Sequence, residues 1–229
     1  MDYITAKWAY YARKRNVGGS SQSSRLPGGY KEYRYFYRNN PDTTTYIDTG
    51  LNLSSTMTWE LSATLGVLQG DFSPIGTGNT KSDSNYALWI HNKDSRVSAE
   101  AVFGNGNSSA CIVEVSVDTT KVHTYKMVLN TGQFYIDGVL AGTASSVGGV
   151  STAKKLIVSG CWRGSQVQGI FKGWQGETLI RNNGVLARDY VPCLRISDDK
   201  PGMYDLVSGA FQSLAGENVN LIDSFTANS

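Results

Sequence analysis

Apolar and polar residues alternate with a period of two along most of the chain after residue 30. From Met57 to Leu65 every second side chain is apolar, and residues 97–103, 111–117 and 125–129 repeat the pattern. This alternation is typical of strands that bury one face. No stretch after residue 30 keeps a helical period. The pattern therefore predicts an all-β fold of about a dozen short strands.

Turn-forming residues separate the predicted strands. Asp137-Gly138 stands between the apolar segments 134–136 and 139–140, and this is the strongest hairpin signal in the chain. Asn182-Asn183-Gly184 marks a second turn. Short strands with turns at such intervals predict a two-sheet antiparallel β-sandwich.

The composition fits one domain of this kind. The chain has 229 residues, enough to bury a substantial core, and its 25 Gly and 13 Tyr suit turns and strands. Its cysteines, Cys111, Cys161 and Cys193, are odd in number and form no CxxC motif, and the chain has only two histidines. This argues against a structural metal and predicts buried, reduced thiols in a protein folded in a reducing cytoplasm. No apolar run reaches the length of a membrane span and no signal peptide is recognisable, so we expect no membrane-spanning segment and no secretory export.

The first 29 residues differ from the rest. Residues 1–38 carry eight basic and two acidic residues, a net charge of +6, whereas the whole chain carries +2. Residues 1–15 suit a short helix, and the Gly/Ser-rich segment 16–24 reads as a linker. We therefore expect an N-terminal arm over residues 1–29 and a sandwich over residues 30–229. Nucleic acid, a membrane surface and another protein are all open as partners of the arm. Its candidate docking residues are Trp8, Tyr10, Tyr11, Arg13, Lys14 and Arg15.

Five segments of the predicted sandwich resemble a known family. They are Tyr46–Gly50 (YIDTG), Tyr86–Ile90 (YALWI), Phe134–Thr143 (FYIDGVLAGT), Asn183–Cys193 (NGVLARDYVPC) and Gly202–Phe211 (GMYDLVSGAF). In this order they look like the laminin-G-like, concanavalin-type domains of phage and prophage structural proteins, and the resemblance covers residues 30–216. We read the last two segments as packing that closes the sandwich, since Pro192 ends a strand.

The resemblance implies a concanavalin-like jelly roll in a bacteriophage virion protein, made in the host cytoplasm. Capsid decoration, a head fibre and a tail-associated protein are all open as roles. The arm would then dock to another virion protein, so we expect no membrane partner, and nucleic acid is the less favoured one. The domain itself would bind host-surface or environmental glycans, or only decorate the particle. The chain lacks coiled-coil heptads, and its oligomeric state, a homo-oligomer included, stays open.

The sequence favours a non-catalytic protein without cofactor or metal. The alternative is a polysaccharide-degrading enzyme of the concanavalin-like glucanase type, but the Glu-x-Asp-x-x-Glu strand of those enzymes is missing. Glu114 alternates with apolar Val113 and Val115, so we expect it at the surface. No GxSxG motif occurs. A calcium ion in a loop, through Asp71 or Asp94, is left open.

Sugar binding needs an exposed aromatic plate beside polar groups. Trp162 follows the apolar segment 156–160, and we expect it on a loop as a ligand platform or as a cap on the sandwich. Trp59 should be core, and core positions are favoured for Trp89 and Trp174, although Trp89 stays a platform candidate. The candidate glycan-binding residues are Trp162, Arg163, Gln166 and Trp89.

Overall fold

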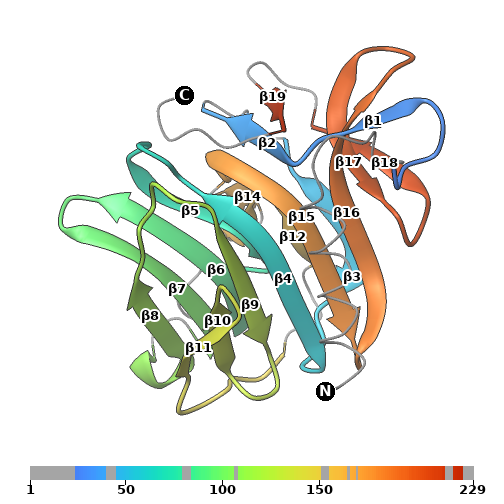
Figure 1. The fold of residues 1–229 in the computed structure, drawn as a ribbon. Helices are drawn as coiled ribbons and strands as arrows, with labels where there is room; N and C mark the ends of the chain where they lie inside the picture. The colour runs from blue at the N-terminus through green and yellow to red at the C-terminus, as the bar shows by residue number, and fades with distance from the viewer. Residues whose placement is uncertain are drawn as a thin grey trace.

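The chain is described here from a computed structural model, over residues 24–39, 45–78, 84–105, 108–150, 155–163, 166–168, 170–214 and 219–223. The six candidate docking residues of the arm, Trp8, Tyr10, Tyr11, Arg13, Lys14 and Arg15, lie outside these ranges. The described residues form two antiparallel sheets packed face to face (Figure 1). The predicted two-sheet antiparallel sandwich is therefore confirmed. In these ranges no helix has the length and apolarity needed to cross a membrane.

The larger sheet has eleven strands. Its main path runs β11 (Val139–Thr143), β10 (Gln133–Ile136), β9 (His123–Val128), β4 (Met57–Thr64), β15 (Gly173–Asn182), β16 (Val185–Arg195), β17 (Lys200–Asp205) and β18 (Ala210–Ser213). Three further strands join this sheet. β1 (Tyr30–Glu32) pairs with β16, β2 (Tyr35–Arg38) pairs with β15, and β19 (Val219–Ile222) pairs with β2. This sheet thus brings together the two ends of the described chain.

The smaller sheet has six strands. In order they are β3 (Ile47–Asn52), β12 (Lys155–Val158), β5 (Gly70–Gly76), β6 (Ser84–Lys93), β7 (Arg96–Asn105) and β8 (Ile112–Ser116). A short 3-10 turn, η1 (Ser109–Cys111), precedes β8. A separate two-stranded ribbon, β13 (Cys161–Arg163) and β14 (Gln166–Gln168), contacts β5 and β12.

The alternating apolar residues fill the core between the sheets. In β4, buried and half-buried residues alternate from Met57 onward as the sequence predicts. Trp59 and Trp174 are each 1% exposed, so their predicted core positions are confirmed. Val97 was expected on the apolar face but is 38% exposed, because it follows the turn at Asp94 that joins β6 to β7. The three cysteines are buried and unbridged, as expected.

The predicted turns form where the sequence places them. Asp137 and Gly138 have φ angles of 52° and 80°, and Asn183 and Gly184 have 49° and 77°. Left-handed backbone at both central residues is typical of tight hairpin turns, whose twist matches that of the paired strands. The hairpins β10–β11 and β15–β16 therefore follow from local sequence.

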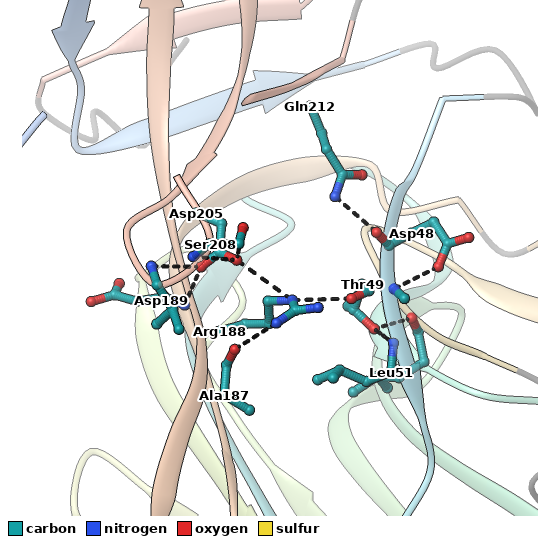
Figure 2. A network of polar contacts seen from close by, with 12 residues as sticks. Asp48, Thr49, Leu51, Ala187, Arg188, Asp189, Asp205, Ser208 and Gln212 are labelled. Carbon is teal, nitrogen blue, oxygen red and sulfur yellow. Dashed lines mark hydrogen bonds and ion pairs between the residues drawn. The ribbon is translucent and has the colours of Figure 1, made fainter. Parts of the chain in front are cut away.

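A polar clasp ties one edge of the smaller sheet to the larger sheet (Figure 2). The Arg188 side chain on β16 donates from Nε to the Thr49 carbonyl of β3 at 3.0 Å. Gln212 on β18 donates from Nε2 to the Asp48 carbonyl at 2.8 Å. These bonds satisfy backbone carbonyls of an edge strand that would otherwise lack partners from the larger sheet.

Asp205 holds the Arg188 end of the clasp. Its carboxylate is 1% exposed and lies 3.5 Å from the Arg188 Nε. It accepts hydrogen bonds from the backbone N–H groups of Asp189 at 2.9 Å and Val207 at 3.1 Å, and from the Ser208 hydroxyl at 2.5 Å. A buried charge with this many donors is compensated, which allows it to fix the turn after β17.

The clasp explains three of the five family-like segments. Asp48 and Thr49 come from the first, Arg188 and Asp189 from the fourth, and Asp205 from the fifth, and Figure 2 shows them meeting at one place. These bonds support the closing role that we expected for the fourth and fifth segments. The expectation that Pro192 ends a strand is wrong, since Pro192 lies within β16 and pairs with Met203 of β17.

We predict that Asp205→Ala destabilises the protein by about 3–5 kcal/mol, because it leaves Arg188 and several buried N–H and O–H donors without their acceptor. Urea unfolding followed by tryptophan fluorescence measures this loss. Asp198→Ala is the matched control, since Asp198 is exposed and paired only at the surface with Arg195 and Lys200. Equal unfolding midpoints for the two variants would contradict the role given to the clasp.

Candidate functional site

The outer face of the smaller sheet carries charged and aromatic side chains. In β6, Tyr86, Leu88 and Ile90 enter the core, so Trp89 and His91 point to the opposite face. The same alternation in β7 and β8 sends Ser98, Glu100 and Glu114 outward. We call the surface formed by Asp71, Trp89, His91, Arg96, Glu100 and Glu114 the outer polar face.

Strand register brings these residues together. Trp89 pairs with Glu100 across β6 and β7, and Glu100 pairs with Glu114 across β7 and β8. In the next row, His91 lies between Asp71 on β5 and Ser98 on β7. Side chains directly opposite on one face of a sheet lie within contact distance of each other. The outer polar face is thus a product of four neighbouring strands.

Arg96 holds the two glutamates in place. Its Nε donates to Glu114 Oε1 at 2.7 Å, and its Nη2 donates to Glu100 Oε2. Ser98 donates its hydroxyl to the same Glu114 oxygen at 2.5 Å. The hydrogen bond from Arg96, with that from Ser98, lowers the pKa of Glu114 below its usual value. Glu114 is therefore ionised near neutral pH, and its expected surface position is confirmed by a 40% exposed side chain.

His91 is 4% exposed, and its two ring nitrogens have different surroundings. Nδ1 lies 2.7 Å from Asp71 Oδ1. Because an ionised carboxylate only accepts hydrogen bonds, Nδ1 carries the proton, and in the neutral ring Nε2 is an acceptor. Nε2 has no hydrogen-bond partner and lies 4.0 Å from Glu100 Oε2, which is another acceptor.

Trp162 occupies a different part of the same sheet face. It lies on β13 rather than on the expected loop, and its Nε1 donates to the Lys155 carbonyl at 2.9 Å. Its half-buried ring packs against a small apolar cluster of Ile157, Val167 and Ile170. These contacts favour the capping alternative over the ligand platform.

The structure places three of the predicted glycan-binding residues, Trp162, Arg163 and Gln166, on the β13–β14 ribbon and separates them from Trp89. Trp162 bonds to the start of β12, whereas Trp89 lies on β6, with β5 between these strands. The side chains of Arg163 and Gln166 lie outside the described part of the chain. Among the four candidates, Trp89 is the one whose described neighbours include fixed polar side chains, since it pairs with Glu100 on the outer polar face.

Sequence reasoning missed Arg96, His91 and Glu100. One signal was present, since His91 and Glu100 stand at the polar positions of two alternating strands. The missing information was the register between these strands. Register decides which residues of neighbouring strands lie opposite Trp89 and which lie one pair further along. Among the described residues, no three His, Cys, Asp or Glu side chains are arranged to hold a metal ion.

A second acidic group lies on the larger sheet. Asp189 on β16 lies close to Glu177 on β15, and Arg25 bonds to both Glu177 and Glu32. Burial, and then the nearby Glu177 charge, raise the pKa of Asp189 to about 7. Leu26, next to Arg25, is buried against Val191 and Cys193, so the chain covers this part of the sheet. We interpret this group as structural.

The pKa of Asp189 predicts a dependence of stability on pH. An unfolded aspartate has a pKa of about 3.9, so between roughly pH 4 and pH 7 the folded protein binds a proton that the unfolded chain releases. The contribution of Asp189 is therefore fully present below pH 4 and is lost as the pH rises through about 7. Asp189→Asn should remove this loss, which unfolding midpoints between pH 5 and pH 8 measure. Asp198→Asn should keep the wild-type slope, and a wild-type slope in Asp189→Asn would refute the assignment.

We compared the chain with known proteins, and the similarity found is one of fold. No protein-family model matches the chain, and no curated protein sequence matches it. Among solved structures, the chain is similar to the native heptameric SAP-like pentraxin from Limulus polyphemus, with 9% sequence identity and a TM-score of 0.40. The match covers 71% of this chain and 72% of the pentraxin chain. A likeness at this level concerns the course of the strands and carries no information about ligands.

Proposed function

We propose that this chain is a non-catalytic glycan-binding module that binds sugars on the outer polar face and is carried on a bacteriophage virion. The observation that supports glycan binding best is the position of Trp89. Its half-buried ring stands in register with Glu100 on an outward sheet face, beside groups that bind hydroxyls. An aromatic plate flanked by fixed polar groups is the arrangement that sugar rings require.

The polar groups around Trp89 are held in place before a ligand arrives. Arg96 and Ser98 fix Glu114, and Arg96 also fixes Glu100, whose side chain is 16% exposed. Carboxylates held in one orientation accept hydrogen bonds from neighbouring hydroxyls with little further loss of side-chain entropy. This preorganisation supports specific binding by a shallow surface.

The charges on the face favour binding over hydrolysis. A glycosidase needs one carboxyl group that is protonated at working pH beside one that is ionised. Arg96 contacts both glutamates and lowers the pKa of Glu114, so the face has no evident proton donor of this kind. Asp189, whose pKa is raised, belongs to the other sheet and lies beside Glu177 and Arg25. The polysaccharide-degrading alternative is therefore the weaker proposal.

The virion assignment rests on the five ordered family-like segments. The basic, aromatic residues 1–23 precede the sandwich and would dock it to a capsid or tail protein. Arg25 and Leu26, which we expected in the arm over residues 1–29, instead contact the larger sheet, so the segment proposed to dock is residues 1–23. The sandwich would then project a glycan-binding face from the particle.

We predict that Trp89→Ala weakens oligosaccharide binding by about tenfold, because it removes the stacking surface. A glycan array followed by isothermal titration calorimetry with the best ligand measures this, and the melting temperature should change little. Trp162→Ala is the matched control. It should lower stability by about 3 kcal/mol through the loss of an apolar cap, with affinity unchanged in the folded protein. Wild-type affinity in Trp89→Ala would refute the binding site.

The virion assignment has its own test. Deleting residues 1–23 keeps Arg25 and Leu26, so the truncated chain should fold with an unchanged melting temperature. It should no longer co-purify with phage particles, because the docking residues are gone. Incorporation at normal occupancy, measured by quantitative mass spectrometry of purified particles, would contradict docking through the arm.

A further inference from the structure

The outer polar face has an excess of negative charge. Its three carboxylates, on Asp71, Glu100 and Glu114, face a single guanidinium, on Arg96, among the residues that define it. At the adjoining β6–β7 turn, Lys93 and Asp94 cancel each other. The three carboxylates and the one guanidinium sum to a net charge of −2, so the face attracts cations and repels anions.

The face also has an excess of hydrogen-bond acceptors. The Arg96 donors described above are taken by the two glutamates, and the Ser98 hydroxyl is taken by Glu114. His91 Nδ1 donates its hydrogen bond to the Asp71 carboxylate. His91 Nε2 then points toward Glu100 Oε2, 4.0 Å away, and neither atom has a hydrogen to offer the other. Glu100 Oε2 accepts from Arg96, so His91 Nε2 is the buried acceptor left without a donor. Such an acceptor costs free energy, and a ligand that supplies a donor to it stabilises the face.

These two properties distinguish between classes of glycan. An acidic sugar would bring more negative charge to a face whose guanidinium is already paired with carboxylates. A neutral hydroxyl supplies one hydrogen, whereas a primary ammonium supplies three together with a positive charge. Trp89, in register with Glu100, adds an aromatic surface that attracts both sugar rings and cations.

We propose that the outer polar face selects glycans with free primary amines, that is, polymers with deacetylated hexosamine units. This inference rests on the proposed glycan binding and adds the chemical class of the ligand. The ammonium lies over Glu100 and Glu114, and the sugar ring that carries it stacks on Trp89. Charge and acceptor surplus give the preference, while stacking gives the general affinity for sugars.

The test compares two ligands that differ only in the amine. Glucosamine hexamer and N-acetylglucosamine hexamer are titrated calorimetrically into the full chain, at a pH where the free amine is protonated. We expect the deacetylated hexamer to bind about tenfold more tightly, the typical effect of charge-assisted hydrogen bonds. Raising the salt concentration should reduce this preference, because the ion pairs are near the surface.

Variants assign the preference to the face. Glu100→Gln and Glu114→Gln should each weaken binding of the deacetylated hexamer more than binding of the acetylated hexamer, and so reduce the tenfold preference. Asp198→Asn changes the net charge equally, but Asp198 pairs with Arg195 beside the larger sheet, so both affinities should stay at wild-type values. The double variant Glu100→Gln/Glu114→Gln releases Arg96 and should gain affinity for a hexamer of glucuronic acid.

The outcomes separate this inference from the proposed function. Equal affinity for the two hexamers, with loss of both in Trp89→Ala, would overturn the amine preference and leave glycan binding in place. Tighter binding of acidic glycans by the wild-type chain would also overturn it. Absence of binding to any glycan would overturn both proposals.

Discussion

The structure depends on how a buried carboxylate, that of Asp205, is compensated. A sandwich is closed by apolar packing between its sheets, but such packing does not fix the edge strands. Asp205 collects donors from its own turn and orients Arg188, whose guanidinium reaches the β3 backbone at Thr49. This places an edge of the smaller sheet against β16. The three family-like segments that meet at the clasp therefore serve the closure of the sandwich.

The two sheets use their outer faces differently. On the larger sheet, Leu26 packs on Val191 while Arg25 pairs with Glu177, so a segment of chain covers apolar and acidic residues together. On the smaller sheet, the β13–β14 ribbon contacts β5 and β12, and Trp162 packs with its cluster. Strands β6, β7 and β8 lie beyond the strands that this ribbon contacts. Apart from Asp71 on β5, the residues of the proposed binding face therefore lie on strands that the ribbon does not contact.

The fold could be predicted from sequence because its signals are local. Alternation identified β4 and β9, and Asp137-Gly138 identified the β10–β11 hairpin, since both depend on neighbouring residues. The candidate site could not be predicted from sequence, because it depends on the register between strands. Glu100 and Glu114 are far apart in the chain, and a shift of one residue would turn either of them into the core. Trp162 was misplaced for a related reason, since a three-residue strand such as β13 has no period to detect.

Register also explains why the binding face that we propose is preorganised. A loop site must be ordered by its ligand, and that ordering reduces affinity. Here β6, β7 and β8 are fixed by their core residues, so Trp89, Glu100 and Glu114 are aligned as a consequence of packing on the other side. Arg96 then sets the carboxylate orientations without entering the core. The preference for one class of ligand can therefore change through outward residues alone, while the inward residues of the same strands keep the fold.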